Sequence, residues 1–326
     1  MKKVISILLL ILFFACTENS KRPIDFYYWR SNYNISAVEK ETISNLEVKK
    51  LYVRFFDVDK KMVEPVPIGT IKNFDASNLD VEYIPTVFIT NRTFLNLKND
   101  DVNKLAQNID NLITEIAEKG KLNNYTEIQI DCDWTKSTKE NYFLFLNQLK
   151  NISKKNISAT LRLHQVKFKD REGIPPLDKM VLMCYATENP SEVQDKNSIL
   201  DLNLANDYLN NLEDYPIKLD VALPIYSWAI ITNHIGKIKI VNSFDEKRLI
   251  NQPVKLIGKG IYEVTDDFFL EKFYLSKGFK IKVETVSQNL LNETKIFLNS
   301  KLNDEFRFVY FHLDDQFITN YNFTNR

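Results

Sequence analysis

The sequence predicts an α/β protein whose strands form a (β/α)8 TIM-type barrel, with an inserted subdomain before the last strand. Apolar runs of strand length recur eight times, and amphipathic helical patterns separate several of them. Strands that alternate with helices pair in parallel, because a parallel connection needs a crossover of about a dozen residues. The sequence lacks the glycine-rich turn that is typical of an open nucleotide-binding sheet, which favours a closed barrel.

Eight strands and five helices are expected along the chain. Nearly continuous hydrophobicity in the strands is typical of a sheet that is covered on both faces. Ser36 with Glu39, and Ser137 with Glu140, have the spacing of a helix capping box and mark two helix starts. The expected strands are residues 24–31, 50–59, 81–90, 127–134, 157–164, 179–186, 219–228 and 306–315. The expected helices are residues 36–46, 101–119, 138–151, 198–211 and 286–302.

Two stretches depart from the simple alternation of strand and helix. Residues 60–80 show little helical pattern between the second and third strands. Residues 232–285 are longer than one crossover needs and contain strand-like runs at 237–241 and 260–264, which predicts the inserted subdomain. No repeat or long linker indicates a second domain, so residues 23–326 are expected to form one barrel with this insert.

The composition is that of a neutral globular protein. The chain has 43 Lys and Arg against 43 Asp and Glu, and 44% of its residues are hydrophobic. A balanced charge gives no attraction to phosphates, so no nucleic-acid partner is expected. The three His occur without an H-x-H or H-E-x-x-H spacing, and no C-x-x-C pair is present. Neither a metal nor another cofactor is therefore expected.

The first residues have the pattern of a secretion signal. Two lysines precede an apolar run at residues 4–14, which is too short to cross about 30 Å of hydrocarbon as a helix. The following Ala15-Cys16 completes a segment that resembles the cleavage box of bacterial lipoproteins. This resemblance implies that residues 1–15 are a signal peptide and that residues 16–22 form a tether, whose Cys16 carries the lipid.

The lipoprotein resemblance also implies a location and a membrane partner through Cys16. Thr17 differs from the Asp that retains some bacterial lipoproteins at the inner membrane, so a cell-envelope location at the outer membrane is favoured. An ordinary secretory signal or an uncleaved anchor is the alternative. The other two thiols, Cys132 and Cys184, lie in apolar segments and are expected to be free and buried, with a disulfide between them as the alternative.

Charged residues alternate with apolar ones near the carboxyl ends of two expected strands, where barrels of this kind place their chemistry. Asp131 and Asp133 share one face of the fourth strand, and Arg162 and His164 share one face of the fifth. We expect the two aspartates to form an ion pair with Arg162 at the barrel axis, which Arg54 joins. The alternative is that the two arginines bind a carboxylated substrate. His164 is a candidate acid or base.

The fourth expected strand, residues 127–134, resembles a motif of a known family. It reads Ile-Asp-Cys-Asp-Trp, which resembles the middle of the D-G-x-D-x-D-x-E strand of glycoside hydrolase family 18, the chitinase-type barrels, and the sixth strand ends in Met-Cys-Tyr, similar to the family's M-x-Y-D. The resemblance implies that Asp131 and Asp133 match the two inner aspartates and that Tyr185 matches the tyrosine. The family's last Glu protonates the glycosidic oxygen. Thr135 stands at its position here.

Other acids near strand ends are candidates to replace that Glu, namely Asp59, Glu188 and Asp314. Parity along the last strand groups His312 with Asp314, which makes His312 a candidate for proton transfer and equally for a structural role. Strand parity does not choose among these residues.

Aromatic residues also fall at the expected strand ends. Flat rings beside carboxylates suit sugar rings, which present C–H groups to the ring and hydroxyls to the acids. The alternative for each ring is packing in the barrel. The aromatic candidates for substrate binding are Trp29, Trp134, Tyr185, Tyr226 and Trp228.

These observations predict a lipid-anchored cell-envelope protein with a glycoside-hydrolase-like barrel. Its expected ligand is a glycan or another small polar molecule, and whether the barrel hydrolyses that ligand is left open by the missing Glu. The alternatives are a non-catalytic carbohydrate-binding lipoprotein and a scaffold lipoprotein of the envelope.

Overall fold

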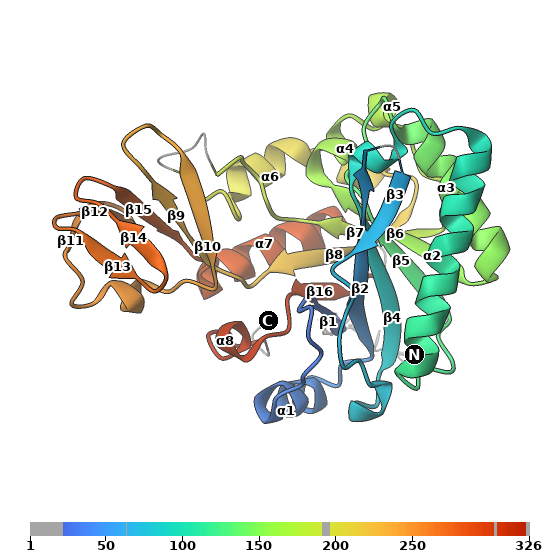
Figure 1. Ribbon diagram of the computed structural model, residues 1–326, viewed down its shortest axis with the longest axis horizontal. Helices are drawn as coiled ribbons and strands as arrows, with labels where there is room; N and C mark the ends of the chain where they lie inside the picture. Colours follow the sequence, from blue (N-terminus) through green and yellow to red (C-terminus); the bar gives the residue numbers. More distant parts are fainter. Residues whose placement is uncertain (1–21, 63, 191–195, 303–304, 324–326) are drawn as a thin grey trace, which may run out of the picture.

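A closed eight-stranded parallel barrel forms the centre of the molecule (Figure 1). The computed structural model describes residues 22–62, 64–190, 196–302 and 305–323. The first strand pairs with the second on one side and with the last on the other, which closes the barrel and confirms the expected (β/α)8 TIM-type fold. The barrel strands are β1 (Ile24–Tyr28), β2 (Lys50–Lys61), β4 (Glu82–Ile89), β5 (Glu127–Asp131), β6 (Asn156–Arg162), β7 (Lys179–Met183), β8 (Lys218–Pro224) and β16 (Phe308–Phe311).

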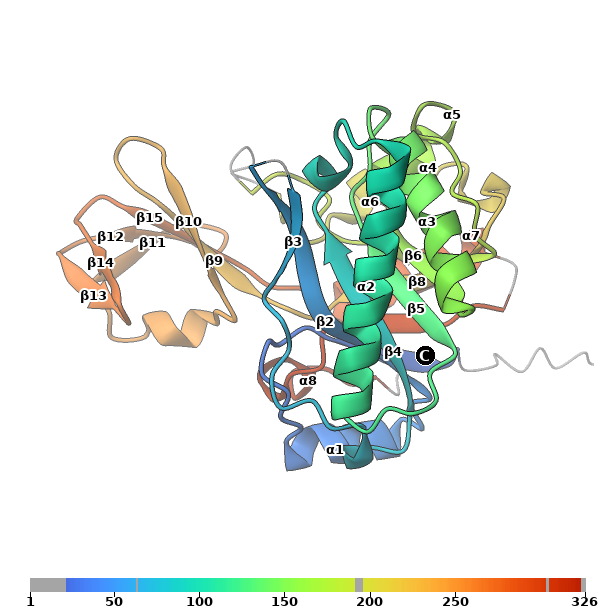
Figure 2. The ribbon, with the colours of Figure 1, turned by 45° about the vertical axis from the view of Figure 1, so that its right-hand side comes forward.

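Helices cover the outside of the barrel, and Figure 2 shows α2 and α3 lying in front of its strands. In α2 a stripe of apolar side chains with helical spacing is buried, including Val102, Ile109 and Ile113. No helix in the described ranges is both long and apolar enough to cross a membrane. The helices are α1 (Ala37–Asn45), α2 (Asn99–Lys119), α3 (Lys139–Ser153), α4 (Leu163–Lys167), α5 (Lys169–Glu172), α6 (Leu202–Tyr208), α7 (Gln288–Lys301) and α8 (Asp315–Ile318). Short 3-10 helices are η1 (Ala76–Asn78), η2 (Asn91–Phe94), η3 (Leu212–Asp214) and η4 (Glu246–Leu249).

One of the two expected capping boxes is present. Ser36 caps α1 by accepting a hydrogen bond from the backbone N–H of Glu39, whose carboxylate accepts one from the N–H of Ser36. The prediction of a second capping box, from Ser137 to Glu140, is wrong. Thr138 is the N-cap residue of α3 and makes no capping hydrogen bond, because its hydroxyl donates to Asn91 in the neighbouring loop instead.

The stretch between the second and third barrel strands forms a hairpin without a covering helix. β2 continues beyond the barrel and pairs antiparallel with β3 (Glu64–Ile68). This agrees with the weak helical pattern of residues 60–80. β5 and β6 are shorter than expected and end at Asp131 and Arg162, respectively.

A ring of charged side chains holds the amino-terminal ends of the strands together. Asp25 of β1 is fully buried, accepts a hydrogen bond of 2.8 Å from the backbone N–H of Lys50, and pairs with the Arg307 guanidinium. The Lys50 ammonium in turn lies 2.9 Å from the Glu127 carboxylate. The buried ionic network is therefore at the base of the barrel, at the opposite end from the expected one.

An antiparallel sheet between β8 and α7 forms the insert, which projects to one side of the barrel (orange in Figure 1). It begins at Trp228, earlier than expected. It has its own buried core, which includes Ile231, Phe244 and Ile281. Its five-stranded sheet consists of β9 (Trp228–Thr232), β10 (Ile238–Asn242), β11 (Val254–Gly258), β12 (Ile261–Val264) and β15 (Lys280–Glu284), and β13 (Phe268–Leu270) pairs with β14 (Phe273–Leu275) in a separate hairpin.

Cys132 and Cys184 are free thiols, as expected, and both are fully buried. They belong to the apolar layer between the barrel strands and the surrounding helices. Burial raises the pKa of the Cys184 thiol to about 12, so this sulfur stays protonated.

Candidate functional site

Four neighbouring strands place aromatic rings at the mouth of the barrel. In the strand order β1, β16, β8, β7, these rings are Trp29, Phe311, Tyr226 and Tyr185. The Phe311 ring is the centre of the cluster, with centroids 5.5 Å from Trp29, 5.8 Å from Tyr226 and 5.6 Å from Tyr185. Tyr185 is buried, and its hydroxyl has no hydrogen-bond partner among the described residues. We call these four rings the aromatic half of the mouth.

Trp228 extends the aromatic half toward the insert. Its ring centroid lies 5.3 Å from that of Tyr226, and its indole N–H donates a hydrogen bond of 2.7 Å to Glu284. Glu284 is buried and also receives hydrogen bonds from Ser198 and an ion pair of 2.7 Å from Lys282. This carboxylate therefore joins the first and last strands of the insert to the loop that follows β7. Sequence reasoning missed Glu284, because it stands alone at the end of an ordinary alternating strand.

The opposite side of the mouth is charged and comes from β5 and β6. Asp131 is 6% exposed and accepts a hydrogen bond of 2.7 Å from the Thr160 hydroxyl. Asp133, whose side chain is 50% exposed, lies 3.4 Å from Nε of Arg162. Burial, together with the neighbouring charge of Asp133, raises the pKa of Asp131 to about 7 against the opposing effects of Thr160 and Arg162. We call these residues the charged half of the mouth.

Arg54 does not join this pair of aspartates, which corrects the expected network. It lies in β2 just before a β-bulge, and its guanidinium is held by the Asp57 carboxylate at 2.6 and 2.5 Å. Gly69 lets the backbone pass close by, because a Cβ there would lie 2.6 Å from the guanidinium. The ion pair of Arg54 is therefore local to the β2–β3 hairpin.

Trp134 is not at the mouth, and its expected position is wrong. The ring is fully buried outside the barrel, where it stacks on Tyr142 of α3 at a centroid distance of 5.2 Å. Its indole N–H donates to the backbone carbonyl of Glu172. Trp134 has the same parity as Ile130, and this apolar face of the strand meets the helices.

His312 is not at the mouth either, so its place among the site residues is wrong. Val309 and Phe311 face the barrel interior, whereas Tyr310 packs in the outer layer and His312 contacts Phe317 of α8. Both faces of this strand are apolar, so parity alone could not show which one points inward. Burial lowers the pKa of His312 to about 4 in this outer position.

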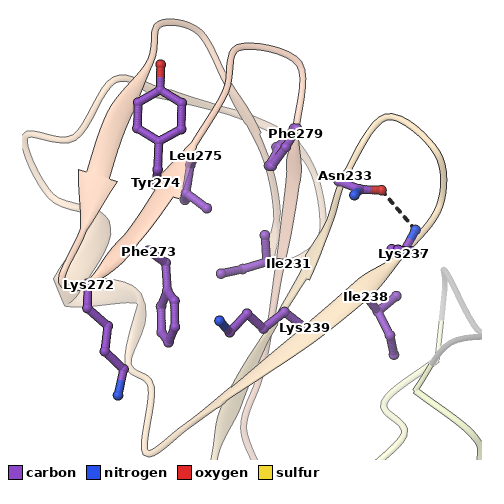
Figure 3. Close-up of a pocket in the computed structure, with 10 residues that line it drawn as sticks. All are labelled: Ile231, Asn233, Lys237, Ile238, Lys239, Lys272, Phe273, Tyr274, Leu275 and Phe279. Carbon is purple, nitrogen blue, oxygen red and sulfur yellow. Dashed lines mark hydrogen bonds between the residues drawn. The ribbon is translucent and has the colours of Figure 1, made fainter.

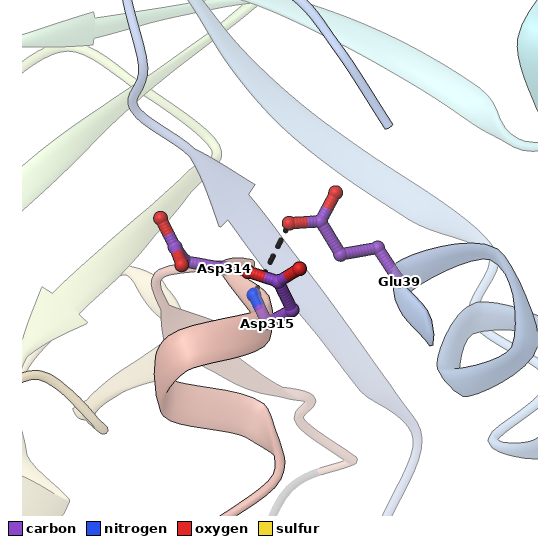
Figure 4. Close-up of side chains that lie close together, drawn as sticks. All are labelled: Glu39, Asp314 and Asp315. Atoms are coloured by element: carbon purple, nitrogen blue, oxygen red, sulfur yellow. Dashed lines mark hydrogen bonds between the residues drawn. The ribbon is translucent and has the colours of Figure 1, made fainter. Parts of the chain in front are cut away.

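Asp314 belongs to an acidic cluster on the α1 and α8 side (Figure 4). Carboxylate oxygens of Glu39, Asp314 and Asp315 lie within 4.8 Å of one another. Asp314 caps α8, and Glu39 is buried and accepts a hydrogen bond from the Asp315 N–H. Arg30 contacts Glu39 at 2.8 Å, so the cluster carries its own counter-charge and serves to dock the two helices.

The remaining candidates lie around the rim or beyond it. Asp59 is in the part of β2 beyond the barrel and pairs with Arg92, which holds its pKa well below the usual range. His164 lies on α4, because the strand ends two residues earlier, and burial together with Arg162 lowers its pKa. Glu188 is half-buried in the loop after β7.

Thr135 lies in a network of neutral side chains. Its hydroxyl is 3.0 Å from the hydroxyl of Ser137 and accepts a hydrogen bond of 3.3 Å from the Asn91 amide. Its backbone N–H donates to the Thr138 hydroxyl. These contacts hold Thr135 in the loop between β5 and α3 without a carboxylate.

Known structures resemble the fold closely enough to align over most of the chain. A chitinase from Chromobacterium violaceum ATCC 12472 is 12% identical with a TM-score of 0.58, covering 91% of this chain and 96% of that one. The spore cortex-lytic enzyme SleL of Bacillus cereus is 16% identical with a TM-score of 0.54, covering 93% and 75%. A class V chitinase from Nicotiana tobaccum, an E115Q mutant in complex with NAG4, is 11% identical with a TM-score of 0.51, covering 91% and 96%.

At these identities the likeness is one of fold, and it places this barrel beside chitinases and chitinase-like proteins. No protein-family model matches the chain, and no curated protein matches it significantly.

The raised pKa of Asp131 predicts a pH-dependent stability. The folded protein keeps a proton on Asp131 up to about pH 7, whereas the unfolded chain releases it near pH 4, so this residue makes the fold less stable as the pH rises between these values. Asp131→Asn removes this loss. We expect its free energy of unfolding, relative to the wild type, to rise with pH by up to about 1.4 kcal/mol per unit between these limits.

Urea unfolding at a series of pH values measures this difference. Asp178→Asn, which changes a carboxylate whose side chain is 93% exposed, is the matched control and should give a difference that does not vary with pH. A pH-independent difference for Asp131→Asn would contradict the assignment of a raised pKa.

Proposed function

We propose that this protein binds a glycan at the barrel mouth, and that the glycan contains N-acetylglucosamine. The observation that carries the proposal is the division of the mouth into two halves. Trp29, Tyr226 and Phe311 are partly exposed rings on neighbouring strands, and Asp133 with Arg162 faces the same opening from β5 and β6. Rings of this kind can stack on the C–H faces of sugars, while the charged groups bond their hydroxyl and amide groups.

The chitinase-like fold and the NAG4 complex of the Nicotiana tobaccum chitinase support this class of ligand. Binding without hydrolysis is favoured by the surroundings of Thr135. Glycoside hydrolysis needs a carboxylic acid that protonates the leaving oxygen. At Thr135, where the resemblance would put that acid, the side chain bonds to the hydroxyls of Ser137 and Thr138 and to the Asn91 amide, which are all neutral groups.

Truncation of the aromatic half should therefore weaken glycan binding. We expect Trp29→Ala and Tyr226→Ala each to raise the dissociation constant for the N-acetylglucosamine tetramer about tenfold, because each removes a ring on which a sugar stacks. Isothermal titration calorimetry measures this. Trp134→Phe, which changes a ring buried outside the barrel, is the control and should bind like the wild type. Absence of binding at millimolar tetramer, or equal affinity in all four proteins, would contradict the proposal.

Hydrolysis is a second candidate, and the pKa of Asp131 favours it. A carboxyl group that keeps its proton up to about pH 7 has the property that a general acid needs. Asp131 lies two residues before the exposed Asp133, so two carboxyl groups come from one strand end. In this alternative Asp131 holds the proton and Asp133 with Arg162 orients the substrate.

A fluorogenic chitobioside separates the two candidates. Because the described partners of the Thr135 hydroxyl are neutral groups, we expect release of the fluorophore at the background rate. Turnover that Asp133→Asn abolishes and Asp59→Asn retains would instead establish hydrolysis, since Asp59 is paired with Arg92 in the hairpin beyond the barrel. The tetramer titration tests binding independently of this result.

We also propose that the protein is a lipoprotein of the cell envelope, anchored through Cys16 and delivered to the outer membrane. Residues 1–21 lie outside the described residues, and the support comes from the apolar run at residues 4–14 that Ala15-Cys16 follows. Arg22 stacks on Phe306 at 4.2 Å, and the Pro23 carbonyl accepts a hydrogen bond from Phe308 at the base of the barrel. The six residues of the tether that precede Arg22 span about 20 Å at most. Such an anchor would hold the base near the membrane and leave the mouth facing away.

Replacement of Cys16 should release the protein from membranes. We expect Cys16→Ser, expressed from the full precursor in a Gram-negative host, to lose incorporation of labelled palmitate and to move from the membrane fraction to the soluble fraction, because the thiol that carries the lipid is gone. Cys184→Ser is the matched control and should remain in the membrane fraction. Palmitate labelling that persists in Cys16→Ser would contradict the proposal.

A further inference from the structure

A pocket of about 330 Å³ lies on the insert, and none of the residues that line it belongs to the mouth of the barrel. Its walls come from the β9–β10 hairpin on one side and from β14 with the start of β15 on the other, and Figure 3 shows the side chains that line it. This volume is at the lower end of the range of small-molecule sites.

The floor of the pocket is apolar. Ile231 and Leu275 are 4% and 2% exposed and belong to the core of the insert, and the rings of Phe273 and Phe279 pack against that core while remaining partly exposed. Figure 3 labels these four side chains among those that line the pocket. A ligand that lies on this floor would remove hydrocarbon surface from water, so the floor suits an apolar or aromatic body.

The rim of the pocket is cationic. Lys237 and Lys239 come from one hairpin and Lys272 from the other, and all three are exposed. The ammonium of Lys239 lies 3.7 Å from the centroid of the Phe273 ring, and that of Lys272 lies 5.6 Å from the same centroid. Within the described ranges, no carboxylate lies within 4.0 Å of any of these three ammonium groups. Two cations therefore lie around one ring, and neither forms an ion pair within the part of the chain that the structure describes.

The acids nearest in sequence to this rim are engaged elsewhere. Glu271 pairs with Arg248 at 2.8 Å. Asp267 accepts a hydrogen bond of 2.6 Å from the Tyr274 hydroxyl and another from the backbone N–H of Lys277. The insert as a whole, residues 228–284, has ten Lys and Arg against seven Asp and Glu, although the complete chain is balanced. The excess positive charge at the pocket is thus not cancelled locally.

We propose that this pocket binds a small amphiphilic anion, a carboxylate or phosphate group attached to an apolar or aromatic body. The anionic group is bound by Lys239 and Lys272 at the rim, and the body lies on Phe273 and the apolar floor. A neutral sugar fits less well, because the Asn233 side chain already accepts from the N–H groups of Ile235 and Lys237. This site is independent of the glycan site proposed at the mouth.

Calorimetric titration of the purified protein with 4-phenylbutyrate tests the proposal. We expect 4-phenylbutyrate to bind, and its neutral amide and acetate each to have an affinity at least about tenfold lower. The amide lacks the negative charge, and acetate lacks the aromatic body. An increase from about 0.05 M to about 0.5 M salt should weaken phenylbutyrate binding several-fold. A parallel titration with phenyl phosphate shows which anionic group the lysines prefer.

Variants of the rim identify the site. The double variant Lys239→Gln/Lys272→Gln should lose affinity for phenylbutyrate by at least about tenfold. Lys239→Arg/Lys272→Arg should keep most of the affinity, because it keeps both positive charges. Lys255→Gln, which removes an exposed lysine from β11 outside the pocket, is the matched control and should bind like the wild type. The substituted lysines are exposed, and thermal unfolding of each variant checks that the insert remains folded.

Three results would overturn the proposal. They are absence of phenylbutyrate binding at millimolar concentration, equal affinity for phenylbutyrate and its amide, and unchanged affinity in the double glutamine variant. None of these results bears on binding of the N-acetylglucosamine tetramer at the mouth, so the two proposals fail or stand separately.

Discussion

The buried carboxylate of Asp25 is the contact through which the barrel closes. It lies in the first strand, which pairs with both the second and the last, and it binds the backbone of Lys50 on one side and the Arg307 guanidinium on the other. Loss of one member of such a buried pair leaves an uncompensated charge, which costs several kcal/mol. The closure of the barrel, and with it the convergence of eight strand ends at the mouth, depends on this contact between residues far apart in sequence.

The charged residues that stabilise the barrel and those of the candidate site lie at opposite ends of its strands. The charges at the base are paired with one another, so the stability of the closed sheet does not require the acids at the opposite end. Asp131 and Asp133 are consequently left with few partners, namely a threonine hydroxyl and one arginine at 3.4 Å. The barrel order then sets aromatic rings from β7, β8, β16 and β1 opposite this charged edge. A mouth of this kind suits a ligand with both apolar and polar faces.

The insert adds a second environment that the barrel does not provide. Its sheet has its own core, and Glu284 ties it to the barrel through Trp228 and the loop after β7. The cationic rim around Phe273 is built entirely from insert residues. The mouth combines rings with acids, whereas the insert pocket combines rings with lysines, so the two sites are suited to ligands of different charge.

The sequence by itself determined the alternation of strands and helices, the place of the insert and the polar face that carries Asp131 and Asp133, because these depend on local periodicity and on the length of crossovers. It did not determine which face of the last strand points inward, since Val309 and Tyr310 are both apolar, nor that Trp134 lies among the helices. Only the tertiary structure decided that Arg54 pairs with Asp57 and that the buried ion pairs gather at the base. The partners at the base are selected by strand order and by barrel closure, which arise from contacts between distant parts of the chain. Arg54 meets Asp57 through the local shape of the hairpin, at a β-bulge and beside Gly69.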